Sequence, residues 1–195
     1  MGQQGKGTIV EEWETVTIPA APKLERVTLE PSKTALLVLD VQNQNCNAET
    51  RPRCVESVPK IAELLGRARR AGAPVVYSLT RSAEPEDIRE EVRPLDDEPV
   101  VRSGVDKFYG TELENMLKER RVKTVILVGT SSNGAVLHTA TGAAARGLDV
   151  VVPVDGMSAS DAYAEQYTAW HLVNAPGTRR VTRLTTVGAI GFKVS

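Results

Sequence analysis

The sequence has few of the residues that bind metals or build disulfide scaffolds. It contains only two cysteines, Cys46 and Cys54, and two histidines, His138 and His171, which lie far apart. Two cysteines do not make a disulfide framework, and their scarcity favours a reducing compartment. No pair of these residues has the spacing of a zinc site. We therefore expect no metal, no cofactor and a cytoplasmic location.

Long apolar runs and an excess of one charge are also missing. The longest apolar runs, such as Ala35–Leu39, are far shorter than the ~20 residues that a membrane helix requires. The first residues have no apolar core, so we expect no export signal. With 24 Lys and Arg against 25 Asp and Glu, the net charge is -1, which provides no positive field for phosphate backbones. We expect a small-molecule substrate, no nucleic acid and no membrane.

Short apolar runs alternate with segments of helical periodicity between Thr34 and Leu184. The apolar runs predict strands at 34–40, 74–78, 100–102, 124–128, 149–154 and 180–184. Apolar residues three and four positions apart predict helices at 55–71, 111–120, 134–146 and 160–174. The alternation predicts an α/β domain of three layers, with a mostly parallel central sheet flanked by helices.

The predicted domain covers residues 34–185. Residues 1–33 form an N-terminal leader or arm that wraps the domain, in which Thr15–Ile18 has the alternation of an edge strand. Residues 186–195 form a C-terminal tail. The acidic segment Ala83–Pro99 is predicted to be a surface excursion or lid.

Ligands of parallel sheets bind beyond the carboxyl ends of the strands. The predicted strands place three features there: Asp40, Arg102 and the turn Gly129–Ala135. This geometry selects the candidate site residues without reference to any family.

Several ordered segments resemble the isochorismatase-like hydrolases, also called the cysteine hydrolase superfamily. Leu37–Asn43 resembles the first catalytic segment of that family. Further similar segments are Ala68–Tyr77, Phe108–Leu113, Val125–Gly129 and Ala135–Thr139. The resemblance implies a Rossmann-like fold and a dimer or tetramer. It also implies an Asp-Lys-Cys triad, in which Asp is the base, Lys supports it and Cys attacks an amide or nitrile-like carbon.

Only one member of that triad is unchanged in this sequence. Asp40 matches the aspartate, whereas the lysine position falls on Arg102 and the cysteine position on Ala135. Lys107 is a neighbour that can reach the site from its loop. Alanine cannot form a thioester, so covalent amide hydrolysis by the family route is excluded. The family's isochorismatases, which cleave a vinyl ether, have a small residue at this position and use the aspartate as a general acid.

The remaining candidates concern substrate binding. A guanidinium stays protonated, so Arg102 is expected to hold a carboxylate, which leaves Asp40 as the only titrating catalyst. Gln42 is expected either to bind the ligand or to satisfy loop backbone. Asn133 and Gly134 open a helix, where free amides hold an anion or merely form an N-cap.

The leading hypothesis is a hydrolase that acts non-covalently on a small anionic metabolite, at a vinyl ether or related bond, with Asp40 as general acid/base. One alternative is a catalytically silent homologue that binds a ligand or a partner. Another is an amidase-type cysteine hydrolase whose nucleophile is replaced by Ala135. An enzyme requires Asp40 to titrate in a closed pocket, whereas a binding protein allows it to be solvated. The resemblance adds the expectation of a homodimer or homotetramer.

Overall fold

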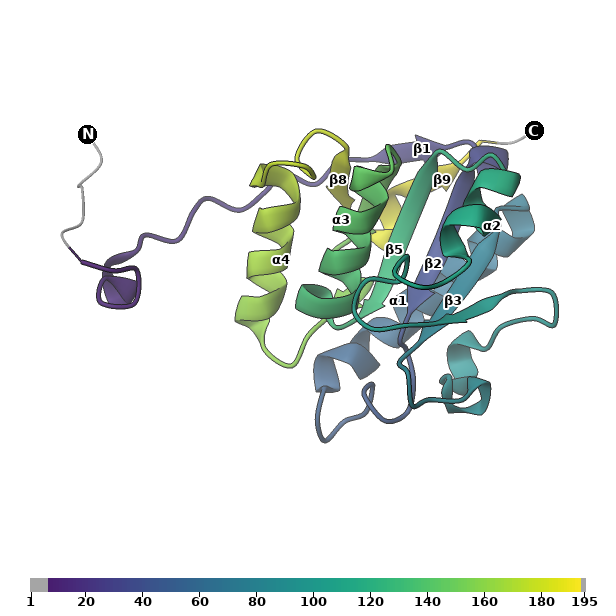
Figure 1. The fold of residues 1–195 in the computed structure, drawn as a ribbon, viewed down its shortest axis with the longest axis horizontal. Coiled ribbons are helices and arrows are strands. Elements are labelled where there is room, and N and C mark those ends of the chain that lie inside the picture. The colour runs from purple at the N-terminus through teal and green to yellow at the C-terminus, as the bar shows by residue number, and fades with distance from the viewer. Residues whose placement is uncertain (1–6, 194–195) are drawn as a thin grey trace.

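The computed structural model describes residues 7–193, and a parallel sheet forms the centre of that part of the chain (Figure 1). Its strands run in the order β4-β3-β2-β5-β6-β8, with β7 beside β5, and every pair is parallel. The strands are β2 (Thr34–Leu39), β3 (Val75–Leu79), β4 (Val100–Arg102), β5 (Thr124–Thr130), β6 (Asp149–Pro153), β7 (Met157–Ser158) and β8 (Thr182–Thr185). This confirms the predicted α/β fold with a mostly parallel sheet.

The central strand β2 fixes where the site lies. All six of its residues are buried, as expected for an apolar strand covered on both faces. The chain runs from β2 to β3 and β4 on one side, and then returns to β5 on the other side of β2. The side on which successive strands are added therefore changes between β2 and β5, although the two strands are parallel. In open α/β sheets, ligands bind in the crevice between the carboxyl ends of two such strands.

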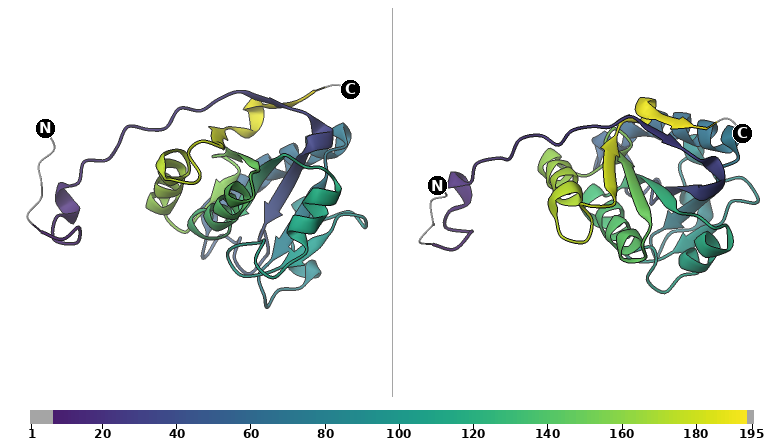
Figure 2. Two further views of the ribbon diagram at one scale, coloured as in Figure 1. Left: turned by 45° about the horizontal axis from the view of Figure 1, so that its top comes forward. Right: turned by 90° about the horizontal axis from the view of Figure 1, so that it is seen from above.

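Helices cover both faces of the sheet (Figure 2, right). α1 (Pro52–Ala71) packs on one face, where Val58, Ile61 and Leu65 join the core. α2 (Leu113–Glu119), α3 (Leu137–Ala145) and α4 (Ala162–Asn174) cover the other face. A π-helical turn, Ser132–Val136, leads directly into α3. Within residues 7–193, no helix has the length and apolar character to cross a membrane.

The N-terminal residues differ from the prediction. Within residues 7–193, Thr15–Ile18 pairs with no strand. The segment before β1 (Val27–Leu29) runs outward in Figure 1, but it contacts the body at two points: the ring centroids of Trp13 and Tyr163 of α4 are 6.4 Å apart, and the amide of Glu25 donates to Leu184 O at 2.8 Å. Pro19 and Pro22 follow the expected strand, and because proline has no amide hydrogen, it interrupts a ladder. Residues 1–6 of the predicted arm lie outside the described residues.

The predicted C-terminal tail, residues 186–195, contains a strand, β9 (Ile190–Phe192), in its described part. This strand pairs in parallel with β1 as a separate two-stranded sheet. Arg67 of α1 donates hydrogen bonds to the carbonyls of Val187 and Ile190. The strand was missed because the short run Ile190–Phe192 is interrupted by Gly191.

The segment between β3 and β4 folds back over the carboxyl end of β2. It contains two 3₁₀ turns, Pro85–Asp87 and Glu90–Val92. The amide of Asn43 donates to Asp87 O at 2.8 Å, and the amide of Arg89 donates to Val41 O at 3.0 Å. This segment therefore helps to enclose the residues that follow β2.

Candidate active site

Asp40 follows β2 directly, at the crevice between β2 and β5. Its φ of 51° lies in the left-handed region, which aspartate tolerates better than most residues. Its amide donates to Ser78 O at 3.2 Å, and its Oδ1 accepts a hydrogen bond of 2.7 Å from Ser78 Oγ. Only 5% of Asp40 is exposed. The carboxyl is therefore fixed and enclosed rather than solvated at a loop surface.

The cation beside Asp40 is Lys107. Its Nζ donates to Asp40 Oδ2 at 2.7 Å and to Gly104 O at 2.7 Å, and its side chain is fully buried. The backbone amide of Lys107 donates to Thr139 Oγ1 at 3.2 Å, which fixes the loop against α3. A buried lysine stays charged only when it is paired, so Asp40 and Lys107 depend on each other.

Arg102 does not lie where the sequence analysis placed it. Its Nη2 donates to Glu84 Oε2 at 2.7 Å, and 43% of its side chain is exposed. Burial alternates along β4, so Arg102 follows the buried Val101 on the exposed side of the strand. The expectation that Arg102 holds a carboxylate beside Asp40 is therefore wrong in its geometry.

The loop after β4 explains why Lys107 reaches the site instead. Ser103 Oγ lies 3.0 Å from Asp106 O and 2.9 Å from Tyr109 O, so that its single hydroxyl hydrogen is shared between two carbonyls of the loop and holds the loop in a turn. Counting positions along the sequence assigns the triad lysine to Arg102, because such counting carries no information on the path of a loop. Lys107 was among the candidate binding residues, but its pairing with Asp40 was not predicted.

Burial dominates the electrostatics of Asp40. Removal from water raises the pKa of its carboxyl above the ordinary value, while Lys107, Ser78 and Arg51 act to lower it. A carboxyl with a raised pKa keeps its proton to higher pH. Asp40 is therefore a buried carboxyl whose pKa is raised by its surroundings, an arrangement that is common at functional sites.

The turn after β5 begins at the same crevice and contains Ala135. Gly129 pairs with Leu39 and has a φ of 121°, and a Cβ there would lie 2.0 Å from Leu39 O, so only glycine fits. Ala135 is 3% exposed. Four residues later, Thr139 contacts the backbone of Lys107. The structure thus brings Asp40, Lys107 and α3 together, and Ala135 lies in the π-helical turn that precedes α3.

Gln42 has a structural role. Its Nε2 donates to Thr80 Oγ1 at 2.9 Å, and its Oε1 accepts from the amide of Thr80 at 3.2 Å. Both ends of this buried amide are occupied, so Gln42 joins the loops after β2 and β3. These bonds match the alternative in which Gln42 satisfies loop backbone, and a role in substrate binding stays a prediction.

Asn133 and Gly134 occupy the outer part of the turn. Asn133 is exposed and Gly134 is partly buried. A Cβ on Gly134 would lie 2.6 Å from Ser131 Oγ, so glycine makes room for that side chain. The amides of Gly134 and Val136 donate to Ser131 O. A role of Asn133 and Gly134 in ligand binding stays a prediction.

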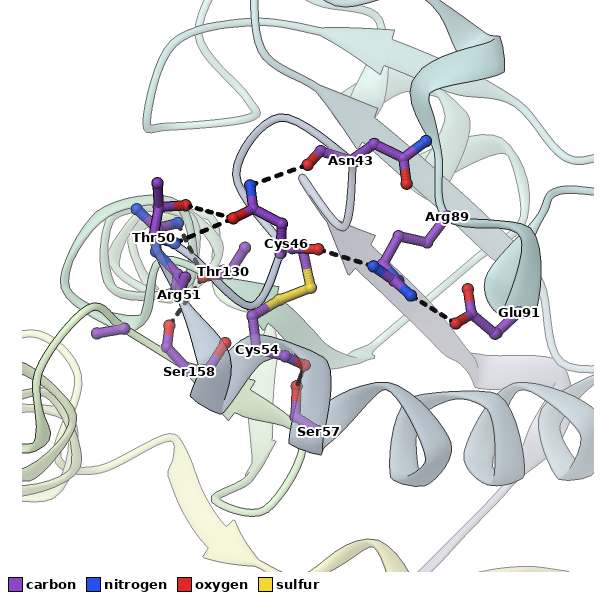
Figure 3. The surroundings of a disulfide bond; sticks show 12 residues. Asn43, Cys46, Thr50, Arg51, Cys54, Ser57, Arg89, Glu91, Thr130 and Ser158 are labelled. Carbon is purple, nitrogen blue, oxygen red and sulfur yellow. Dashed lines mark hydrogen bonds and ion pairs between the residues drawn. A yellow bond between two sulfur atoms is a disulfide. The ribbon is translucent and has the colours of Figure 1, made fainter.

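A disulfide joins Cys46 to Cys54, contrary to the expectation from the sequence (Figure 3). Both residues are fully buried, and their Cα atoms are 5.2 Å apart. Asn47 turns the chain between them, since its Oδ1 accepts from the amides of Glu49 and Thr50. The expected cytoplasmic location was argued partly from cysteine scarcity, and it loses that support.

Arg51 is a site residue that the sequence analysis missed. It lies immediately before α1 and is partly buried. Its Nη1 donates to Thr130 Oγ1 at 3.0 Å, and its Nε donates to Ser160 Oγ at 3.3 Å (Figure 3 labels Arg51 and Thr130). Its position beside β5 depends on the path of the disulfide loop, for which the sequence carries no periodic signal.

The described residues offer no cluster of metal ligands. Within residues 7–193, no three His, Cys, Asp or Glu side chains are grouped so that they could hold a metal ion. The polar groups around Asp40 are a lysine, an arginine and hydroxyls, which suit proton transfer and anion binding.

Comparisons with known proteins identify the family of this chain. Residues 34–186 match the family model of the isochorismatase domain. The secreted isochorismatase effector Isc1 of Verticillium dahliae is 28% identical over 146 residues, covering 69% of this chain and 77% of that protein. A nicotinamidase of Acinetobacter baylyi is 34% identical over 77 residues, covering 40% of this chain and 36% of that protein.

A solved structure gives the same fold. The cysteine hydrolase of Pseudomonas syringae pv. phaseolicola 1448A superposes with a TM-score of 0.73 at 22% identity, covering 87% of this chain and 95% of that one. The family model spans the sheet, its helices and all the site residues described above. The chain therefore belongs to the isochorismatase family of hydrolases.

Proposed function

We propose that this chain hydrolyses a small anionic molecule without a covalent intermediate, with Asp40 as the group that transfers the proton. The observation that carries the proposal is the environment of Asp40. Its buried carboxyl has a raised pKa and an ammonium partner, Lys107, at 2.7 Å. The helix beside it offers alanine, Ala135, where the family resemblance implies a thiol.

The two partners of Asp40 suit a general acid. The raised pKa allows the carboxyl to hold a proton at a higher pH than an exposed aspartate does. Once the proton has left, the carboxylate remains between Lys107 Nζ and Ser78 Oγ, which stabilise its charge. Lys107 and Ser78 therefore favour the product of proton transfer and hold the carboxyl in place.

A vinyl ether is the substrate class that this acid fits best. Protonation of its terminal carbon makes the other vinyl carbon electrophilic, and water then adds to that carbon. The hemiketal collapses to a ketone and an alcohol, and the proton released by water restores the acid. No step requires a nucleophile on the protein, which is consistent with Ala135.

The second candidate is an amidase-type cysteine hydrolase whose nucleophile is replaced by Ala135, and the position of Lys107 favours it. The pair of Asp40 and Lys107 supplies two members of the triad that the resemblance implies, so only the thiol is missing. A catalytically silent homologue is the third candidate. It gives no reason for a buried carboxyl with a raised pKa, which is an arrangement typical of functional sites.

A substrate screen separates these candidates. Vinyl ethers, amides and esters that carry a carboxylate are incubated with the unmodified chain and with Asp40→Asn. The proposal predicts turnover of a vinyl ether that Asp40→Asn reduces about a hundredfold or more. Turnover that Asp40→Asn leaves unchanged would overturn the assignment of Asp40, and amide turnover alone would favour the second candidate.

We also propose that the chain forms a homodimer or homotetramer, as the family resemblance implies. The arm before β1 exposes large apolar side chains, and these are Ile9, Val10, Trp13, Val16 and Ile18. The outer side of α4 exposes Tyr163, Tyr167 and Trp170. Light scattering of the full chain and of a variant lacking residues 1–22 tests this: the full chain should be oligomeric, and a monomer would contradict the proposal.

A further inference from the structure

Arg51 is partly buried and has no acidic partner in the described chain, whereas Arg67, Arg69 and Arg89, which are also partly buried, each pair with a carboxylate. Ion pairs join arginines to carboxylates at Arg53–Glu165, Arg69–Glu98, Arg89–Glu91, Arg102–Glu84 and Arg146–Glu114. Among residues 7–193, no carboxylate lies within 4.0 Å of the Arg51 guanidinium, although Arg51 is partly buried and several of the paired arginines are more exposed. Its protein partners are two neutral hydroxyls. A partly buried charge without a counter-ion is costly unless a ligand supplies one.

The guanidinium lies at the crevice that contains Asp40. Nη1 donates to Thr130, which is the last residue of β5 and begins the turn that leads to Ala135. Thr130 Oγ1 in turn donates to Ser158 O at 3.1 Å, so its orientation is fixed. The charge of Arg51 also acts on the carboxyl of Asp40. Arg51 therefore lies beside the carboxyl end of β5, close enough to Asp40 for its charge to act on that carboxyl.

The loop that carries Arg51 is held at several points (Figure 3). The amide of Arg51 donates to Asn47 O at 3.0 Å, and its carbonyl accepts from the amide of Cys54 at 2.9 Å. The disulfide closes the same loop, and Pro52 restricts the backbone at the start of α1. A guanidinium on such a loop loses little further freedom when it binds a ligand.

We propose that Arg51 binds the carboxylate of the substrate and so selects anionic substrates at the Asp40 site. Thr130 and Ser160 hold Nη1 and Nε, while Nη2 has no hydrogen-bond acceptor within the described part of the chain. Nη2 and the remaining hydrogen of Nη1 are left as a planar pair of donors that matches a carboxylate. Arg51 thus takes the role that the sequence analysis gave to Arg102. The inference rests on the proposed function for the identity of the site.

Equilibrium binding tests this inference without turnover. Matched acids and amides serve as probes, namely nicotinate with nicotinamide, benzoate with benzamide and pyruvate with pyruvamide, and each is titrated by calorimetry. The unmodified chain should bind at least one acid more tightly than its amide. Arg51→Met should weaken that acid about tenfold or more and leave the amide unchanged. Arg102→Met, the matched control, should change neither.

Further variants keep the test decisive. Arg51→Lys should recover part of the affinity for the acid, since it keeps the charge but not the planar donors. If Arg51→Met does not fold, a chemical-modification experiment on the unmodified chain replaces that variant. The chain is treated with phenylglyoxal, which modifies arginines, with and without each acid, and mass spectrometry measures whether the acid protects Arg51. The inference is overturned if no acid binds more tightly than its amide, if Arg51→Met weakens acid and amide equally, or if the acids do not protect Arg51.

Asp40→Asn separates this inference from the proposed function. Removal of a negative charge near Arg51 should strengthen acid binding several-fold while it removes turnover. If Asp40→Asn keeps its turnover but Arg51→Met still weakens acid binding, the proposed function fails and the role of Arg51 stands. If Asp40→Asn removes turnover but Arg51→Met does not change acid binding, the role of Arg51 fails and the proposed function stands.

Discussion

The ammonium of Lys107 donates a 2.7 Å hydrogen bond to the carboxylate of Asp40, and both side chains are buried. Lys107 reaches Asp40 from the loop after β4, whereas Arg102, the last residue of β4, points outward to Glu84. The charge pairing implied by the family resemblance is therefore present, although the lysine comes from a different position in the sequence.

Lys107→Met should damage both stability and activity. Loss of one partner of a buried ion pair costs roughly 3–5 kcal/mol, because the other charge stays buried and unpaired. Loss of the ammonium also raises the pKa of Asp40 further, since Lys107 acts to lower it. Urea unfolding measures the first effect, and the pH dependence of turnover measures the second.

Arg102→Met is the control for that change. Its exposed ion pair with Glu84 contributes ~1 kcal/mol or less, so stability and turnover should stay close to those of the unmodified chain. The double variant Asp40→Asn/Lys107→Met should recover part of the stability lost in Lys107→Met, since both buried charges are then gone. A larger loss in Arg102→Met than in Lys107→Met would refute the assignment of Lys107.

Ala135→Cys should create amidase activity. The new thiol would lie in a crevice that already contains Asp40 and Lys107, and base-assisted proton removal contributes roughly 10²–10⁴-fold. Release of ammonia from nicotinamide is the measurement, with Ala135→Cys/Asp40→Asn as the inactive control. The unmodified chain should keep its own activity after iodoacetamide treatment. An inactive, correctly folded Ala135→Cys variant would show that Ala135 does not occupy the position of the nucleophile.

The disulfide should stabilise the loop that carries Arg51. Cys46→Ser/Cys54→Ser should lose about 2–4 kcal/mol of stability and bind carboxylates more weakly, because the loop gains freedom. Dithiothreitol should lower the unfolding midpoint of the unmodified chain and leave that of the double variant unchanged. Free thiols at both positions in the purified, unreduced protein would contradict the bond.

Gly129→Ala should be strongly destabilising. Its Cβ would lie 2.0 Å from Leu39 O, at a φ of 121°, so β2 and β5 would have to separate at the crevice. We expect a loss of more than about 3 kcal/mol in urea unfolding. Gly188→Ala is the matched control, because a Cβ at that position would meet no other side chain or backbone within 4 Å, and it should change stability by less than about 0.5 kcal/mol. Equal effects of the two substitutions would contradict the close approach at Gly129.

Much of the sheet could be predicted because buried parallel strands are continuous apolar runs. Thr34–Leu39 has this pattern, and the strand-end rule then identified Asp40 correctly as a crevice residue. The alternation at Thr15–Ile18 gave a wrong strand, since alternation alone does not supply a partner for pairing. The hydrophobic pattern of the sequence therefore predicted the strands of the central sheet better than it predicted the structure of the N-terminal segment.

The site could be predicted only in part, because its charges depend on the paths of loops. Lys107 reaches Asp40 because the loop after β4 curls back, and position counting favoured Arg102 instead. Arg51 lies beside Thr130 because Asn47 and the disulfide turn the chain before α1. These contacts join residues far apart in sequence, and no periodicity in a single sequence encodes them.

The pH dependence of turnover in the unmodified chain and in Asp40→Asn tests the central claim most directly. The acid form of Asp40 is the active form, so kcat/KM should be highest at low pH and should fall as the pH rises through a pKa above the ~3.9 of an ordinary aspartate. Asp40→Asn should lose about a hundredfold or more in rate, and the remaining rate should lack that fall. An Asp40→Asn variant with the rate and the pH profile of the unmodified chain would contradict the account.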